Sequence, residues 1–456
     1  MDGGDRLMLR ERMSGFGEPG VDDDAGRMTG RHVMVLLAGV LICLGPCALV
    51  YNTWSIFVVP VADSLGAASS QFTLFITIIY LIGAIASPFA GNLMERLDLR
   101  IVLTASVVLV AAGMFLCSVW TQVWQFYVSG VIEGLGIVSL MFLAVPTLVN
   151  RWFTVRTGFF IGLCFAMSGI GGALWSMVGG ALLSAFDWRM AYLVFSVVVL
   201  AAGLPATLVL IRSHPEEVGL VAYGSGRRPD DTPSDIPQAD GGSGADERQW
   251  GVSASVMFRS PAFYTLMLAM GIFNALTVTG NLFASYIYHL GSLGVAGITP
   301  DGAIMLASGV AACIMIFAAI GKVVLGALSD VSLIAAFVLA CGCGAASILC
   351  MWFGVQSSVY FVYAGGMLCG VLYAAVDSLS PSATRQLVGP RDYTLIYSRV
   401  AIFVNLSGAG AATLFALVAE ISWEAEWIMA LSLIAITFVL GVITIALSRS
   451  LEQTFE

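Results

Sequence analysis

Long apolar runs separated by short polar joints follow one another along most of the chain. Each run has roughly 20 or more residues, the length that a helix needs to cross a hydrocarbon core about 30 Å thick. The pattern therefore predicts an all-α integral membrane protein with twelve transmembrane helices, near residues 33–60, 71–93, 101–119, 126–149, 158–184, 190–211, 262–289, 303–328, 331–353, 358–381, 393–420 and 426–448.

Polar segments divide these runs into two groups of six. Residues 1–30 are rich in Gly, Asp and Arg, and we expect a disordered cytosolic tail without a signal peptide. Residues 212–258 are rich in Pro, Gly, Ser and acids, so they cannot bury a core and are expected to be a cytosolic linker. Six-helix bundles are predicted over 31–211 and 259–448, and 449–456 would be a second cytosolic tail.

The positive charges predict the orientation in the membrane. Of the 20 Lys and Arg, all but Arg189, Lys322 and Arg399 lie in segments that the alternation of spans places on one side. The positive-inside rule then places both termini and the linker in the cytosol. We therefore expect a multi-pass protein of the plasma (inner) membrane.

The composition supports a membrane protein and excludes several other classes. Hydrophobic residues make up 59% of the chain and charged residues only 11%, which is too apolar for a soluble globular protein. No basic stripe suggests nucleic-acid binding, despite a net charge of −9 that arises mostly in the polar segments. The nine Cys fall in apolar runs without metal-ligand spacing, so neither a disulfide nor a metal or cofactor site is expected.

Two short motifs follow corresponding runs of the two halves. GNLMERLDLR (91–100) follows the second run, and GALSD (326–330) follows the eighth. With twelve spans divided six and six, these motifs resemble those of the major facilitator superfamily, whose loop between helices two and three reads G-x-L-x-D-R-x-G-R-[RK]. The resemblance implies two six-helix bundles with a cytosolic gate formed by Gly91, Glu95, Arg96, Gly326 and Asp330. Because Glu95 replaces the usual Asp and no Arg follows Asp330, we expect a weakened inner gate.

Further segments resemble the oxalate/formate antiporters and their monocarboxylate transporter relatives within that superfamily. They are YNTWSIFVVPVADSLG (51–66), AVPTLVNRWFTVRTGFFIGLCFAMSGIGGALW (144–175), FDWRMAYLV (186–194) and HPEEVGL (214–220). In the second half, AAIGKVVLGALSD and IYSRVAIFVNLSGAG stand where those antiporters carry one cation in helix eight and another in helix eleven. The resemblance implies that Lys322 and Arg399 hold a dicarboxylate.

Lys322 and Arg399 are also unusual on physical grounds, because they lie inside predicted spans. Each is eight residues, or roughly 12 Å of helix, from a polar boundary at Asp330 or Arg391. A cation near the bilayer midplane costs roughly 2.5–3.5 kcal/mol, so a negative group or a water-filled cavity should lie nearby. Two interpretations stay open, namely structural ion pairs and anchors for an anionic substrate.

Two acids lie inside predicted spans as well. Asp377 is eight residues before Arg385 and therefore at a depth similar to that of the cations, where its protonation could couple transport to protons. The alternatives for Asp377 are a fixed bridge to Arg399 and a pair with Lys322. Glu133, in GVIEGLG, is the second candidate for proton coupling, or else a protonated structural carboxyl.

Aromatic and amide side chains are the remaining candidates for substrate binding. Tyr51, Trp54 and Tyr373 match aromatic-rich positions of the oxalate-type cavity, where rings would sandwich a flat acid, and core packing is the alternative. Asn281 shares one helix face with two other polar side chains at seven-residue spacing. Such a stripe is also typical of contacts between helices.

These observations favour secondary transport of a small organic carboxylate, mono- or dicarboxylate, by alternating access. The protein would act in the lipid bilayer as a monomer, either as an exchanger or as a proton-coupled symporter. A drug exporter is disfavoured because the first span has no acid and the fifth lacks the Pro usual in drug antiporters. A membrane sensor of the same anion is disfavoured because no output domain follows Arg449. An enzyme is least expected, since no cluster of nucleophile, base and orienting residue occurs.

Overall fold

The computed structural model describes residues 28–67, 69–225, 253–294, 300–354, 358–390 and 392–455. Nearly all of the predicted N-terminal tail and most of the predicted linker lie outside these residues. Within the described ranges, helices and their connecting turns make up the chain, and no β-sheet is present.

The first half consists of helices α2 to α10. Their bounds are α2 Gly30–Ile42, α3 Ala48–Asn52, α4 Val58–Leu65, α5 Ser69–Arg96, α6 Leu99–Val119, α7 Val123–Val138, α8 Val145–Trp152, α9 Thr157–Ala185 and α10 Trp188–Pro205. Wider, π-helical turns join α2 to α3 (η1, Cys43–Cys47) and α7 to α8 (η3, Ser139–Ala144), and another extends α10 (η4, Ala206–Leu210).

The second half consists of helices α11 to α17. Their bounds are α11 Ala254–Met257, α12 Pro261–Leu293, α13 Pro300–Val331, α14 Leu333–Trp352, α15 Tyr360–Val388, α16 Tyr393–Ile421 and α17 Trp423–Phe455. Over the described residues of both halves, 11 helical segments are long and apolar enough to cross a membrane. The one predicted span that is not among these 11, 393–420, corresponds to α16, a helix of 29 residues that carries Arg399 and Asn405. The predicted all-α membrane fold is confirmed.

The first predicted span, 33–60, is interrupted in the structure. Pro46 lies inside it and has no N–H to donate, and the helix widens there into the π-helical turn Cys43–Cys47. The helix ends at Asn52, and the chain continues through the short turn Trp54–Phe57 into α4. This break leaves Tyr51 and Asn52 in the last turn of α3, where Asn52 Nδ2 donates to the carbonyl of Ser168 in α9 (2.7 Å).

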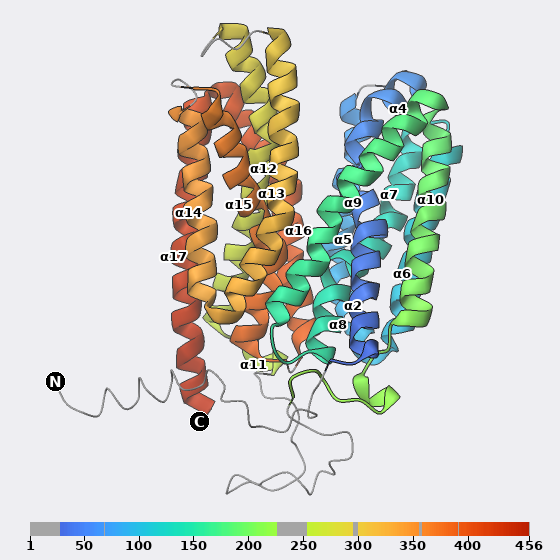
Figure 1. Cartoon of the computed structure of the whole chain (residues 1–456), viewed down its shortest axis with the longest axis vertical. Coiled ribbons are helices and arrows are strands. Elements are labelled where there is room, and N and C mark those ends of the chain that lie inside the picture. The colour runs from blue at the N-terminus through green and yellow to red at the C-terminus, as the bar shows by residue number, and fades with distance from the viewer. Residues whose placement is uncertain are drawn as a thin grey trace, which may run out of the picture.

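The two halves stand side by side as separate bundles (Figure 1). The bundles meet at the end where α2 begins and α17 ends, here called the terminal end, and diverge toward the opposite, distal end. Across their boundary α9 packs on α13 and α5 packs on α16. Glycines permit both contacts, because a Cβ on Gly91 would lie 2.5 Å from Ser398 Oγ and Gly326 lies directly against the backbone of Gly158.

Polar contacts across this boundary concentrate at the terminal end. Asp330, in the last turn of α13, accepts hydrogen bonds from the N–H groups of Gly158 and Phe159 at 2.7 and 2.9 Å. These N–H groups belong to the first turn of α9, where a carboxylate is favoured by the helix dipole. Arg385 of α15 donates to both the backbone and the side-chain oxygen of Asn150 in α8. The structure is therefore closed at its terminal end.

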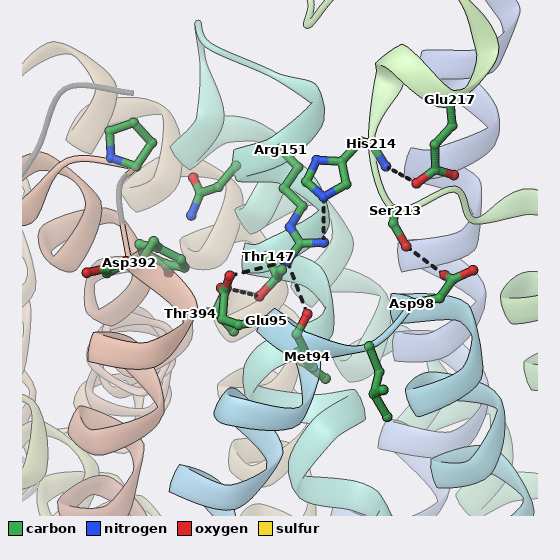
Figure 2. Close-up of a pocket in the computed structure, with 14 residues that line it drawn as sticks. Met94, Glu95, Asp98, Thr147, Arg151, Ser213, His214, Glu217, Asp392 and Thr394 are labelled. Carbon is green, nitrogen blue, oxygen red and sulfur yellow. Dashed lines mark hydrogen bonds and ion pairs between the residues drawn. The ribbon is translucent and has the colours of Figure 1, made fainter. Parts of the chain in front are cut away.

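A polar hollow of about 370 Å³ lies at the same end (Figure 2). Arg151 Nη2 lies 3.8 Å from Glu95 Oε2 on one side of it. On the other side, Ser213 Oγ donates to Asp98 Oδ1 at 2.7 Å. Burial alone would raise the pKa of Asp98, but the hydrogen bonds from Ser213 and the Arg100 N–H, with the nearby arginine charges, lower it overall. Arg96, by contrast, is exposed.

Candidate functional site

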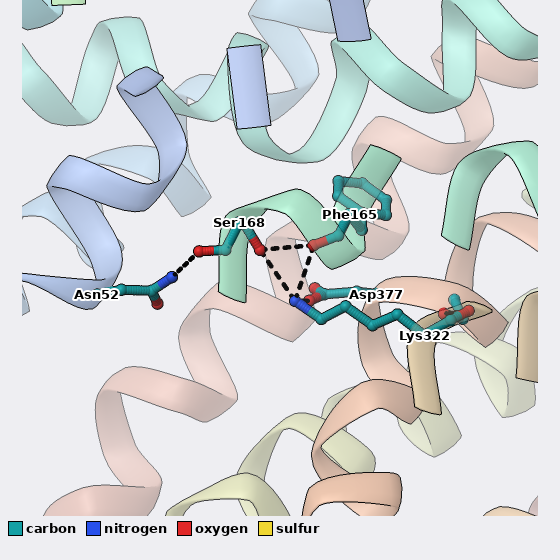
Figure 3. Close-up of polar contacts among 6 residues, drawn as sticks. Asn52, Phe165, Ser168, Lys322 and Asp377 are labelled. Carbon is teal, nitrogen blue, oxygen red and sulfur yellow. Dashed lines mark hydrogen bonds and ion pairs between the residues drawn. The ribbon is translucent and has the colours of Figure 1, made fainter. Parts of the chain in front are cut away.

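Lys322 and Asp377 form an ion pair where the two halves meet (Figure 3). Lys322 Nζ lies 2.7 Å from Asp377 Oδ2, and it also donates to Ser168 Oγ at 3.0 Å and to the Phe165 carbonyl at 3.3 Å. The ammonium has three N–H donors, so these three acceptors satisfy it. Asp377 belongs to the second half, whereas Ser168 and Phe165 belong to the first, so Lys322 bridges the halves.

Local packing explains why Lys322 reaches across the boundary. Gly162 of α9 lies directly against the backbone of Lys322, where any Cβ would clash with the Lys322 carbonyl oxygen. The two helices therefore approach closely enough for Lys322 to meet Ser168, which is less than two turns beyond Gly162. Ser378 Oγ of α15 donates to the Lys322 carbonyl at 2.8 Å and fixes the other neighbouring helix.

A cavity of about 70 Å³ borders this ion pair. It is lined mostly by polar and aromatic side chains from both halves, and the lining residues are Tyr51, Asn52, Tyr80, Met141, Phe142, Ser168, Asn274, Thr277, Lys322, Tyr373, Val376 and Asp377. The rings of Tyr51 and Tyr80 lie 5.1 Å apart. The hydroxyl of Tyr51 is buried and has no hydrogen-bond partner among the described residues, so it offers a free donor beside the cavity.

The charges of this site limit what it can bind. Lys322 is only 3% exposed, and 14% of the Asp377 side chain is exposed. With Asp377 ionised the pair is neutral, whereas with Asp377 protonated the pair carries one positive charge. A carboxylate in the cavity could then take the place of the Asp377 carboxylate beside the ammonium.

The structure brings together four of the predicted site residues, Lys322, Asp377, Tyr51 and Tyr373. Arg399 does not line this cavity. Arg399 Nη1 donates to the Leu395 carbonyl at 2.8 Å, and its guanidinium lies 4.7 Å from the centre of the Phe258 ring. Phe258 precedes α12 at the terminal end, so Arg399 points away from Lys322. The alternative of a fixed Asp377–Arg399 bridge is wrong for this structure, because Asp377 pairs with Lys322.

None of the other three candidates, Trp54, Glu133 and Asn281, lines the cavity with a described side chain. Trp54 lies in the turn after α3 and is not among the lining residues. Glu133 belongs to α7 and is 1% exposed, and its side chain packs against α6. There Cys117 Sγ is 3.9 Å from Glu133 Oε1, and Gly113 makes room for the side chain. The side chain of Asn281 lies outside the described residues.

Several lining residues were missed by the sequence analysis, among them Asn52, Tyr80, Ser168 and Thr277. Each is a polar side chain inside an apolar run, and this signal could have found them. Polar residues of membrane helices also occur on faces that pack against neighbouring helices, so the signal does not by itself select the cavity.

Known proteins share both sequence and fold with this chain. The family model of the Major Facilitator Superfamily matches residues 40–331, more than half of the chain. The oxalate:formate antiporter of Oxalobacter formigenes is 26% identical over 153 residues, which cover 34% of this chain and 36% of that protein. The multidrug efflux pump SdrM of Staphylococcus aureus is 29% identical over 160 residues, which cover 33% of each protein.

These alignments are partial, since the chain covers only 18% to 40% of the length of the curated relatives that it matches first. The match to solved structures, in contrast, covers nearly the whole chain. A structure of the transporter FucP in the outward conformation matches 90% of this chain and 98% of its own, with a TM-score of 0.64 and 17% identity. At that identity the likeness shows a shared fold.

Proposed function

This chain belongs to the major facilitator superfamily and is a multi-pass membrane transporter, and we propose that it carries a small organic carboxylate, mono- or dicarboxylate, by alternating access. One observation carries the proposal. The single lysine of the chain is buried at the contact between the two halves, beside a cavity lined by aromatic and hydroxyl groups. An ammonium in that position offers a fixed positive charge to an anion.

The size of the cavity supports a small acid over a drug. Pockets for drug-sized ligands measure about 300–1,000 Å³, whereas this cavity measures about 70 Å³. Export of drugs is the second candidate, and the similarity to the pump SdrM favours it. A sensor that binds the same acid without moving it is a third.

The Lys322–Asp377 pair supports coupling of the acid to a proton. A monocarboxylate would meet no net charge while Asp377 is ionised, and a charge of plus one once Asp377 is protonated. We infer that one proton enters the site with each monocarboxylate. In exchange of one acid for another, Asp377 would keep its proton through the cycle.

Arg399 remains in the proposal as a second anchor. Its side chain would join the site only in a conformation in which it leaves Phe258 and turns toward the cavity. Tyr51 and Tyr373 would hold the flat face of the acid. Glu133, Trp54 and Asn281 stay candidates without a contact to the cavity in this conformation.

Counterflow in proteoliposomes tests the proposal. Vesicles loaded with formate, acetate, oxalate or malonate would be diluted into the same labelled acid, with a lipophilic cationic dye as the drug control. We expect accumulation of at least one labelled acid by the parent and none by Lys322→Gln. Transport of the dye but of no acid would favour the exporter, and binding of an acid without transport would favour the sensor.

We also propose that the terminal end faces the cytosol of a plasma (inner) membrane, as the distribution of arginines predicts. A single cysteine at Glu216, an exposed residue near that end, should react with an impermeant maleimide only in inverted vesicles. Labelling of intact cells would reverse the orientation.

A further inference from the structure

Glu426 is a buried carboxyl that the proposed site does not use. It lies in the first turn of α17, at the distal end of the second bundle, and is 0% exposed. Neither of its carboxyl oxygens has a hydrogen-bond partner among the described residues. An ionised carboxylate without a partner is strongly disfavoured in such surroundings, so the neutral, protonated form is expected in this conformation.

Its neighbours offer hydrogen-bonding groups but no cation. The adjacent Trp427 indole packs edge-on against the phenol ring of Tyr286 in α12, with ring centres 5.1 Å apart. Neither α12 nor α14 contains a Lys or Arg. Those of the other packed helices, Arg385 of α15, Arg399 of α16 and Arg449 of α17, lie in the halves of these helices toward the terminal end. In the distal halves of these helices, the described titratable side chains are Tyr, Cys, Glu and one His; they include Tyr286, Tyr288 and His289 of α12, Cys350 of α14, Tyr360, Tyr363 and Cys369 of α15, and Glu424 of α17.

A line of polar side chains runs along α15 from its distal half to the central cavity. Cys369, Tyr373 and Asp377 follow one another at four-residue spacing on α15 and therefore share one face of that helix. Cys369 is buried on α15, which packs on α17, and Tyr373 and Asp377 line the cavity. From Cys369 to Asp377 the helix rises roughly 12 Å.

The distal surface next to Glu426 is hollowed. A surface pocket of about 720 Å³ is lined by residues that include His289, Ser285 and Trp423. Trp423 stacks on Trp427, the residue that follows Glu426, with ring centres 6.1 Å apart. Ser422, which also lines this pocket, accepts a hydrogen bond from the N–H of Glu426 at 3.2 Å, so the backbone of Glu426 lies behind the wall of the pocket.

We propose that Glu426 is a second proton-binding site, which loads a proton from the distal side and passes it toward Asp377 during transport. The proton binds a carboxylate oxygen of Glu426 and leaves it for the Asp377 carboxylate, with Cys369 and Tyr373 bordering the path. This inference rests on the proposed coupling of a carboxylate to protons at Lys322 and Asp377. It assigns the entry point of the proton, which that proposal leaves open.

Infrared spectroscopy of the full-length protein in lipid tests the binding step without any transport. A carbonyl band of a protonated carboxylic acid should appear in the parent and weaken as the pH is raised. The parent-minus-variant difference spectrum of Glu426→Gln should contain this band, while the band of the buried Glu133 carboxyl cancels in it. The matched control is Glu424→Gln, which removes the same charge from an exposed position in the same turn and should keep the band. Glu426→Asp should restore a band at a shifted position if the Gln variant fails to fold.

Uptake measurements then test the coupling. Glu426→Gln should retain counterflow of the labelled acid but lose the rise in net uptake when the distal side is acidified. A band that Glu426→Gln leaves unchanged, or one that never titrates, would overturn the inference, as would a parental pH response in the Gln variant. If the parent moves no carboxylate at all, the proposed function fails, while the infrared titration still decides whether Glu426 binds a proton.

Discussion

Replacing Lys322 by Gln tests the central site most directly. The ammonium donates to three acceptors, whereas the shorter, neutral amide of Gln can donate to two at most. A hydrogen bond to a charged group contributes about 1.5–3 kcal/mol. At about 1.4 kcal/mol per tenfold, loss of the contact to a substrate carboxylate should weaken binding by roughly 10- to 140-fold.

The substitution also leaves Asp377 without its cation. Breaking a buried ion pair by removing one partner costs about 3–5 kcal/mol when the other charge stays buried. Asp377 borders the cavity and can bind a proton instead, so the loss of stability should fall below that range. The double variant Lys322→Gln/Asp377→Asn contains no unpaired charge, and it should regain stability without regaining transport.

Counterflow of labelled acids and the thermal stabilisation by each acid are the measurements. Arg259→Gln is the matched control, because it removes one positive charge from an exposed position far from the cavity. At acid concentrations near the parental Kd, both signals should fall close to background in Lys322→Gln and persist in Arg259→Gln. If the double variant transported at the parental rate, Lys322 would be a structural pair member and the assignment of the anchor would be wrong.

Four further substitutions test other parts of the structure. Asp377→Asn should abolish the pH dependence of uptake, and if Arg399 joins the site it should also shift preference toward dicarboxylates; an unchanged pH profile would exclude Asp377 as the coupling group. Arg399→Gln should abolish anion transport without changing the stability of the Lys322–Asp377 pair, and a parental rate would remove Arg399 from the site. Asp330→Asn removes the charge-assisted capping of α9, which contributes about 0.5–2 kcal/mol. The closed terminal end should then open more often, and labelling of a cysteine at Thr394 from that end should rise roughly 2- to 30-fold. Asp98→Asn should lower the stability of the fold only above about pH 4. The folded pKa of Asp98 is lowered, so its carboxylate contributes stability above that pH and loses this contribution as the pH falls through the folded pKa. Thermal unfolding as a function of pH measures the difference.

The sequence by itself determined that the chain folds into membrane-spanning helices and where most of them lie. Bilayer thickness sets the length of each apolar run, and this length is a local property of the chain. The run predicted over 101–119 lies within α6, Leu99–Val119, and the run over 71–93 lies within α5, Ser69–Arg96. The family resemblance was also readable, because it depends on motifs at fixed spacing, and the family match confirms it.

The depth of a residue within the membrane could also be predicted from the sequence, because it too is a local property of the chain. A helix rises by a constant amount per residue, so eight residues from a polar boundary placed Lys322 and Asp377 in one layer. The structure joins these two side chains at 2.7 Å. The count placed Arg399 in that layer as well, but a backbone depth does not say in which direction a long side chain extends.

Only the tertiary structure decided which cation Asp377 meets and where Arg399 points. A membrane helix is apolar on the face toward lipid and on the face toward its neighbours, so hydrophobic periodicity does not fix its rotation about its own axis. That rotation follows from the contacts of glycines such as Gly162 against α13, which bring Lys322 to Ser168 and Asp377. The same packing buries Glu426 without a partner, because the helices around it carry no cation at that depth.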